Sequence, residues 1–307
     1  MSGPSASSVL TIPGVQWTAN QYAGSVVYVV NGKGAYQRRR VTSNTSNALS
    51  LDKAWDVPLD DTSYVSLQTD HSDGIVYNNT FSNVTASVLL YSQSYGFVID
   101  NNQGEGTGGS SCLGWSNGTN PQRNFNNCYF NEWTNNTYSG SLNSTNPNKH
   151  GGTISVLGQN MTGVSEYISN TAILGPILDP TGMDSPTDYA APIVGNIVRG
   201  NTLNAVAEGV NQGWGTIGGI YNRATSDPVS CAAQVKMPNG GATDTLVEKN
   251  TVSNSAKAVF FYPLFGYTLI QNNTFNQNQT NVAEFSFTTC QSINGAVPAA
   301  TIPAAIQ

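Results

Sequence analysis

A short phrase of apolar and polar positions recurs through the middle of the chain. Each copy is an apolar run that ends on an Asn, usually followed by a Thr and then by another apolar residue. The seven copies occupy residues 75–81, 98–102, 133–138, 167–172, 197–203, 246–252 and 269–275. The anchor residues Asn79 and Asn102 lie 23 positions apart, and so do Asn250 and Asn273. A period in the range of about 20–50 residues predicts a stack of repeated units, interrupted here by loops of variable length.

The phrases have the composition and alternation of β-strands. They are rich in β-branched and aromatic residues, and their period is too short for a β-α unit. The position three before each anchor is always apolar: Val76, Ile99, Trp133, Tyr167, Val198, Val247 and Ile270. The position two before the anchor is mostly polar or charged, and the position two after it is nearly always apolar. We therefore expect the residue three before the anchor to point into a core and the next residue to point outward.

The anchors themselves predict a ladder of amides. Where repeated strands stack at a spacing of about 4.8 Å, the anchor asparagines stack with them. Their side chains then hydrogen-bond to one another and satisfy polar groups that a turn would otherwise leave buried and unpaired. Asn also tolerates the left-handed backbone of a sharp corner. We expect the anchors to serve both purposes.

The repeat of apolar–x–x–Asn–Thr–apolar, with its spacing, resembles the right-handed parallel β-helix of the pectin-lyase-like superfamily over roughly residues 70–290. The resemblance implies an all-β solenoid with a core inside the stacked strands. It is more specific for fold than for function, since lyases, glycosidases, epimerases, phage tailspikes and adhesins share this architecture.

The regions outside the repeat have a different composition. Residues 1–8 are predicted to be a flexible leader, and residues 291–307 an Ala/Pro-rich tail or linker. Residues 9–69 predict short strands separated by Gly/Asn turns. Within it, the stretch from residues 32–41 through 55–58 and 61–63 is similar to a segment found within secreted β-helix proteins of unassigned activity, which implies a small β cap or insert that closes one end of the solenoid. Within the repeat, residues 104–124, 139–152 and 176–192 are expected to be long loops, which on a rigid solenoid usually build the binding face.

Composition narrows the possible partners. Charged residues make up 10% of the chain, well below the usual quarter or so, and Ser, Thr, Asn and Gly take their place. A net charge of −6 and the lack of a basic stripe argue against nucleic acid. No apolar stretch approaches the length of a membrane-spanning helix. We expect a secreted or cell-surface protein that binds a polysaccharide or glycan, and leave open a homo-oligomer or a larger parent chain.

Four cysteines without a Cys-x-x-Cys spacing, and only two histidines, argue against a zinc site. Three disulfide pairings are possible, of which we favour Cys112–Cys128 with Cys231–Cys290; four buried free thiols are the alternative. Nine N-x-S/T sequons would permit glycosylation in a eukaryotic or archaeal secreted protein, although three of them overlap the repeated phrase.

No motif in the chain requires an enzyme, and the motifs of polygalacturonases and mannuronan epimerases are absent. Candidate catalytic residues are Glu208, Asp73, Asp70, Lys149 and His150. Glu208 lies on a predicted strand beside an aromatic residue. Asp70 and Asp73 flank an imidazole where the first repeat begins, with turn capping as the alternative role. Lys149 and His150 end a long loop, with a solvated loop tip as the alternative.

Candidate substrate-binding residues are Trp214, Trp115, Tyr221 and Arg199. The aromatic rings suit the apolar faces of sugars, and both tryptophans stand in Gly-rich sequence. Arg199 belongs to the outward column, where an ion pair with Glu248 across repeats is the alternative role.

A cofactor is not required by any of these residues. Asp184 and Asp188, in a Pro-bounded segment, are candidate ligands for Ca²⁺, with capping as the alternative role.

Two functions remain open from the sequence. One is a secreted polysaccharide lyase or glycoside hydrolase that acts on an extended polysaccharide. The other is a non-catalytic glycan-binding, adhesin, spike or surface-fibre module. The sequence does not decide whether the protein is an enzyme.

Overall fold

All regular secondary structure in the described part of the protein is β-strand. The computed structural model describes residues 7–69, 71–84, 87–91, 94–106, 110–119, 122–126, 128–139, 154–160, 172–174, 192–204, 217–218, 241–243, 245–255, 257–261 and 268–284. The chain divides into two compact units, each described by itself. The first contains residues 1–70, 116–126 and 161–187, and the second contains residues 71–115, 127–160 and 188–307.

The first unit is built around an antiparallel sheet with the strand order β1-β4-β3-β2-β5-β19. Its strands are β1 (Val9–Thr11), β2 (Val26–Asn31), β3 (Arg38–Asn44), β4 (Ala48–Leu51), β5 (Tyr64–Gln68) and β19 (Ala172–Leu174). Strand β14 (Gln122–Asn126) also lies in this unit.

Successive side chains of β3 point alternately into the core and outward, so the three consecutive arginines of this strand differ in burial. Arg39 is buried, whereas Arg38 is half-buried and Arg40 is exposed. The Arg39 guanidinium lies 5.0 Å from the ring centre of Trp55 and forms an ion pair with Asp56 at 2.9 Å. The cluster is therefore divided between core and surface and does not form a basic patch.

The second unit contains four sheets that the chain visits in a fixed order. Sheet I consists of β6 (His71–Ser72), β10 (Ser94–Tyr95), β15 (Cys128–Tyr129), β20 (Pro192–Val194) and β24 (Gly241–Thr243). Sheet II consists of β7 (Ile75–Tyr77), β11 (Val98–Asp100), β16 (Glu132–Thr134), β21 (Ile197–Arg199), β25 (Thr245–Glu248) and β28 (Thr268–Gln271).

Sheet III consists of β8 (Thr80–Ser82), β12 (Gln103–Glu105), β17 (Thr137–Ser139), β22 (Thr202–Asn204), β26 (Thr251–Ser253) and β29 (Thr274–Asn276). Sheet IV contains β9 (Val88–Tyr91), β13 (Ser110–Thr119), β18 (Ile154–Asn160), β23 (Ile217–Gly218), β27 (Lys257–Phe261) and β30 (Thr280–Glu284). One passage through the sheets, for example β6-β7-β8-β9, is called a round here.

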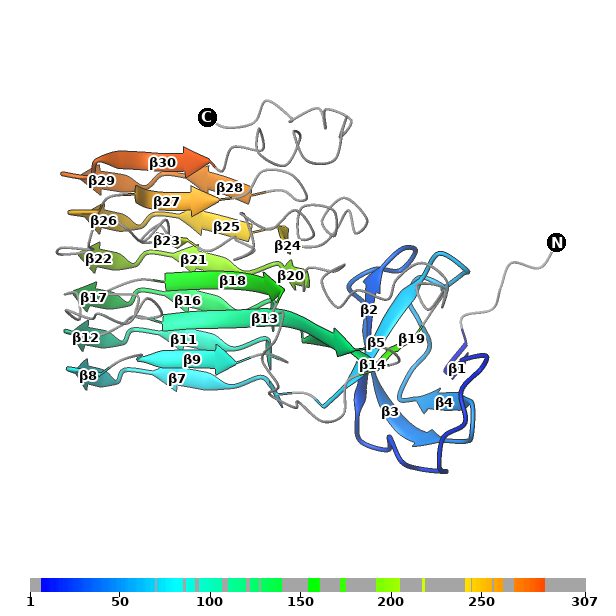
Figure 1. The fold of residues 1–307 in the computed structure, drawn as a ribbon. Helices are drawn as coiled ribbons and strands as arrows, with labels where there is room; N and C mark the ends of the chain where they lie inside the picture. Colours follow the sequence, from blue (N-terminus) through cyan, green and yellow to red (C-terminus); the bar gives the residue numbers. More distant parts are fainter. Residues whose placement is uncertain are drawn as a thin grey trace, which may run out of the picture. The chain divides into compact units, whose positions relative to one another are not determined.

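Strands of successive rounds pair in parallel and in register. Ile99 of β11 pairs with Val76 of the preceding round and with Trp133 of the following round. The same column continues from Trp133 to Val198 and from Val198 to Val247. Figure 1 shows the rounds stacked in sequence order, from β7 and β8 in cyan to β28, β29 and β30 in orange.

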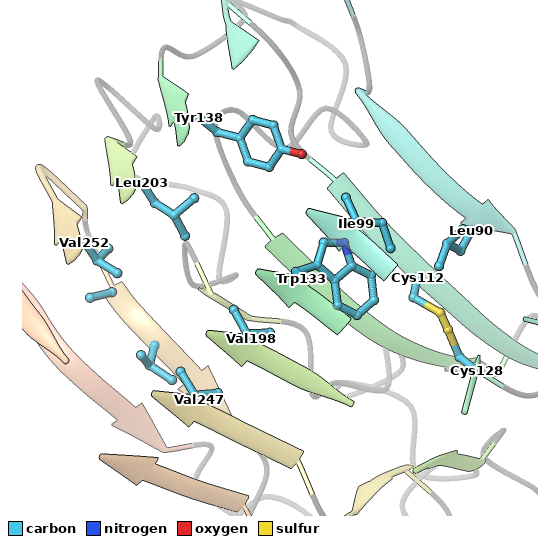
Figure 2. Close-up of a cluster of buried hydrophobic side chains, with 12 residues drawn as sticks. Leu90, Ile99, Cys112, Cys128, Trp133, Tyr138, Val198, Leu203, Val247 and Val252 are labelled. Atoms are coloured by element: carbon cyan, nitrogen blue, oxygen red, sulfur yellow. A yellow bond between two sulfur atoms is a disulfide. The ribbon is translucent and has the colours of Figure 1, made fainter. Parts of the chain in front are cut away.

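The inward columns form the core of the second unit. Ile99, Trp133 and Val198, three before their anchors, are fully buried, as are Tyr138 and Leu203, two after theirs. Figure 2 shows these side chains gathered between the sheets, together with Val247 and Val252. The inward direction predicted for these positions is therefore confirmed.

The anchor asparagines form the predicted ladder. The side-chain oxygen of each anchor accepts two hydrogen bonds from the preceding one, from its backbone N–H and from its Nδ2. Asn102 bonds to Asn136 in this way at 3.0 and 2.9 Å, and Asn136 to Asn201 at 2.9 and 2.9 Å. The whole ladder runs through Asn79, Asn102, Asn136, Asn201, Asn250 and Asn273.

The left-handed corner belongs to a different residue from the one predicted. The residue before each anchor, not the anchor, has a positive φ, as at Asn101 (54°), Asn135 (54°) and Gly200 (68°). Two consecutive residues thus have different roles. The residue before the anchor turns the chain, and the anchor points inward and hydrogen-bonds to the next round. The expectation that the anchors do both was wrong, because a side chain that must point inward cannot also occupy the corner.

A second, shorter ladder lies at the corner between sheets I and II. The Asn131 side-chain oxygen accepts a hydrogen bond from the Phe97 N–H, and Asn196 accepts one from the Asn131 N–H, both at 3.0 Å. The sequence pattern missed this ladder because the equivalent position holds Gly74 and Phe97 in the first two rounds.

The structure describes only the last residue of the phrase at residues 167–172. Ala172 begins β19, which pairs antiparallel with β5 of the first unit. The ladder passes directly from Asn136 to Asn201, 65 residues later. The phrase matches the repeat in composition, but strand pairing, which the sequence does not specify, places its end in a different sheet. Its anchor, Asn170, lies outside the described residues.

Residues 104–124, predicted to be a loop, are mostly strand. β13 spans ten of them and pairs with β9 in parallel. Its Gly- and Ser-rich sequence has a low β-propensity, which pairing with neighbouring strands overrides. The disulfide Cys112–Cys128 is present, as predicted, and both cysteines are fully buried. Cys231 and Cys290 lie outside the described residues.

We expect Asn136→Ala to lower the free energy of unfolding by about 2–4 kcal/mol, because it removes four buried hydrogen bonds and leaves groups on two rounds unpaired. Chemical denaturation measures the change. The matched control is Asn135→Gly at the exposed left-handed corner next to it, where a change within about 1 kcal/mol is expected. Equal losses in the two variants would contradict the role of the ladder.

Candidate functional site

The outer face of sheet II carries a polar column in register across all six rounds. Its members are the residues two before each anchor: Tyr77, Asp100, Thr134, Arg199, Glu248 and Gln271. Beside it runs a second outward column that is mainly aliphatic: Ile75, Val98, Glu132, Ile197, Leu246 and Leu269. Glu132 is the single charged member of the second column, so three carboxylates and one guanidinium share this face.

Asp100 is held by hydrogen bonds from the next round. Its Oδ1 accepts from Thr134 Oγ1 at 2.6 Å and from Asn135 Nδ2 at 2.9 Å. The carboxylate is half-buried. Its position is therefore fixed by contacts that depend on the register of β11 and β16.

Arg199 and Glu248 form the ion pair that the sequence suggested as an alternative. Arg199 Nε donates to Glu248 Oε1 at 2.6 Å, and Gln271 Nε2 donates to Glu248 Oε2 at 2.8 Å. The hydrogen bond from Gln271 and then that from Arg199, with its charge, hold the pKa of Glu248 below its ordinary value, although burial acts in the opposite direction. Substrate binding by Arg199 stays a prediction.

Asp100 and Glu132 place two carboxylates on neighbouring strands. Asp100 pairs with Thr134, so Glu132 lies one strand across and two residues along on the same outer face. Strand spacing and rise put their Cα atoms about 8 Å apart. The sequence pattern did not single out Asp100 or Glu132, because the register between rounds is not visible in the sequence.

The outer face of sheet III is polar and nearly uncharged. Each strand contributes two outward residues, all exposed or half-exposed: Thr80, Ser82, Gln103, Glu105, Thr137, Ser139, Thr202, Asn204, Thr251, Ser253, Thr274 and Asn276. Eleven of these twelve are hydroxyl or amide side chains, and Glu105 is the exception. Hydroxyls and amides both donate and accept hydrogen bonds, so this face offers a regular array of both groups.

Few of the predicted site residues lie in the described part of the chain. Asp73 is exposed at the corner between sheets I and II with a φ of 59°, a geometry that matches its alternative role in a turn. Trp115 lies in β13 and not in a loop. The others lie outside the described residues: Asp70, Lys149, His150, Asp184, Asp188, Glu208, Trp214 and Tyr221. Their roles stay predictions.

Neither a metal cluster nor a membrane-spanning helix is found among the described residues. In the ranges given above, no group of three or more His, Cys, Asp or Glu side chains could hold a metal ion. The same ranges contain no helix that is long and apolar enough to cross a membrane.

No family model and no curated protein matches the chain. Among solved structures, the chain is similar to the tailspike protein gp49 from Pseudomonas phage LKA1, with 9% sequence identity and a TM-score of 0.30. The match covers 88% of this chain and 42% of the tailspike chain, so this chain spans less than half of that protein. A likeness this weak carries no argument about the function of the chain.

The low pKa of Glu248 predicts a pH-dependent contribution to stability. A depressed folded-state pKa stabilises the protein fully above the unfolded-state value near 4.5, and this contribution is lost as the pH falls through the folded-state pKa. We expect Glu248→Gln to be less stable than the wild type at neutral pH, with the difference shrinking on acidification below that value. Urea denaturation from about pH 7 to pH 3 measures it.

The control for this prediction is a double-mutant cycle with Arg199→Gln. The coupling between positions 199 and 248 should be present at neutral pH and decline with the same pH dependence. Coupling that does not change with pH would show that the ion pair is not the source of the effect.

Proposed function

We propose that the second unit is a right-handed parallel β-helix of the pectin-lyase-like kind, and that it belongs to a secreted or cell-surface protein that binds an extended glycan. The fold assignment is supported by the repeated order of the four sheets, the parallel register and the asparagine ladder. Secretion is supported by the buried disulfide, since such bonds persist in oxidising compartments.

The observation that carries glycan binding is the outer face of sheet III. Its outward side chains repeat at the strand spacing of about 4.8 Å, so six rounds extend the array over about 24 Å. A polysaccharide presents hydroxyl groups along its length, and these both donate and accept hydrogen bonds, as Ser, Thr, Asn and Gln do. Because the array holds a single carboxylate, it suits a chain of neutral sugars better than a polyanion.

Loss of hydroxyls from this face should weaken glycan binding. We expect the double variant Thr202→Ala/Thr251→Ala to bind neutral oligosaccharides roughly tenfold to thirtyfold more weakly than wild type, since two hydrogen bonds of about 1 kcal/mol each are removed. Isothermal titration calorimetry with cellohexaose, maltohexaose and chitohexaose provides the measurement. The matched control is Thr11→Ala/Thr42→Ala, two exposed strand threonines of the first unit. Failure of the wild type to bind any of these sugars or a uronate hexamer would refute the proposal.

A second candidate function, glycoside hydrolysis, is favoured by one observation: Asp100 and Glu132 lie on neighbouring strands of the same outer face. Inverting glycosidases use two carboxyl groups about 6.5–9.5 Å apart. In such a reaction one carboxylate removes a proton from water as the water attacks the anomeric carbon, and the other carboxyl protonates the departing glycosidic oxygen. Asp100, already held by Thr134 and Asn135, suits the role of the fixed base.

Hydrolysis is tested by the release of reducing sugars from neutral polysaccharides. We expect Asp100→Asn and Glu132→Gln each to lower the rate by at least about a hundredfold, with the oligosaccharide affinity of Asp100→Asn within a few-fold of wild type. Thr202→Ala/Thr251→Ala should instead weaken binding. Wild-type protein that binds a glycan and releases no reducing ends from it would leave the non-catalytic module as the function.

A further inference from the structure

Phe130 adopts a backbone conformation that its residue type disfavours. It occupies the corner between sheets I and II with a φ of 56°, in the left-handed region. In other rounds this corner is formed by Asp73 (59°), Gly96 (66°) and Gly195 (67°). Gly adopts such a φ without strain and Asp tolerates it, whereas for a bulky aromatic residue it is a rare and strained state.

Burial of the Phe130 ring does not offset the backbone strain. Phe130 is 37% exposed, in contrast to the fully buried Trp133 and Tyr138 of the same round. Three other rounds form the same corner without an aromatic residue. Residues in strained backbone conformations are concentrated at functional sites.

Neighbouring residues hold the Phe130 ring on the outside of the corner. Its ring centre lies 5.5 Å from that of Tyr95 with an interplanar angle of 72°, and 6.0 Å from that of Tyr129 at 70°. Gly195 in the following round leaves the space for it, because a Cβ there would lie 2.3 Å from Phe130 Cδ1. The position of the Phe130 ring is therefore set by edge-to-face contacts with the two tyrosines and by the space that Gly195, which has no side chain, leaves for it.

The charge around this corner is negative. Glu132 lies two residues after Phe130, on the same outward alternation, and Asp73 forms the same corner two rounds earlier. Among the described residues, the Glu132 carboxylate has no hydrogen-bond or ion-pair partner. It is therefore available to accept a hydrogen bond from a sugar hydroxyl, and it would repel a uronate.

We propose that the Phe130 ring, held edge-to-face by Tyr95, forms an aromatic platform that stacks on the ring of a neutral hexose or N-acetylhexosamine, with Glu132 accepting a hydrogen bond from one of its hydroxyls. The flat apolar face of a sugar ring matches an aromatic ring that is fixed in place and partly exposed. This inference rests on the proposed glycan-binding function and deepens it, since it names a subsite and the class of sugar that the subsite takes.

The test exploits the backbone strain. Phe130→Gly is expected to unfold at the same temperature as wild type or higher, because glycine relieves the strain, and to bind neutral hexasaccharides at least tenfold more weakly. Phe130→Trp keeps a ring and should retain affinity within threefold. Asn20→Gly, at an exposed left-handed position of the first unit, controls for the backbone change and should not alter binding. Calorimetric titration with cellohexaose, maltohexaose and chitohexaose and thermal unfolding provide the two readouts.

The outcomes of these measurements distinguish the platform from the proposed glycan-binding function. If wild type binds a neutral hexasaccharide and Phe130→Gly binds it equally well, the platform is refuted while the proposed function stands. A clear loss of thermal stability in Phe130→Gly would show that Phe130 serves the fold, and would also refute the platform. Hexagalacturonate bound as tightly as the neutral sugars would overturn the assignment to neutral rings. A wild type that binds no glycan would overturn both proposals.

Discussion

The organisation of the second unit depends on one requirement, which is that the inward-pointing amide of each anchor asparagine must be hydrogen-bonded. A buried polar group needs a hydrogen-bond partner, and the partners here are the asparagines of the rounds on either side and backbone carbonyls such as that of Ile99. Asn136 meets this requirement with both its oxygen and its nitrogen. Because each bond links successive rounds, a shift by one residue would leave several buried groups unpaired, so the ladder fixes the register as well as the spacing.

A fixed interior leaves the outer faces free to vary. Every inward position is constrained by packing, whereas outward positions need only be compatible with a strand. The same register that aligns the core also aligns the outward side chains into columns, so residues far apart in sequence become neighbours. Arg199, Glu248 and Gln271 meet in this way across three rounds, and Asp100 meets Thr134. The regular columns on the outer faces are thus a consequence of the way the core is built.

At the corners, the backbone conformation that the residue type prefers agrees with the structure in some rounds and conflicts with it in others. Asn78, Asn101, Asn135 and Asn272 turn the chain between sheets II and III, and asparagine tolerates the left-handed conformation that this requires. Phe130 performs the equivalent turn between sheets I and II against its preference. The conflict is confined to a partly exposed side chain, while the buried positions of the same round follow the pattern of the stack.

The sequence by itself determined what repeats locally. It predicted the inward column that includes Ile99 and Trp133 and the asparagine ladder, because alternation and anchor spacing can be read from neighbouring residues. It also favoured the disulfide Cys112–Cys128. Only the tertiary structure decided which strands pair. It placed the end of the phrase at 167–172 in an antiparallel sheet, made residues 110–119 a strand, and brought Asp100 beside Glu132. The physical reason is that pairing partners are separated by loops of unequal length, so the contacts between rounds form in space and leave no fixed spacing in the chain.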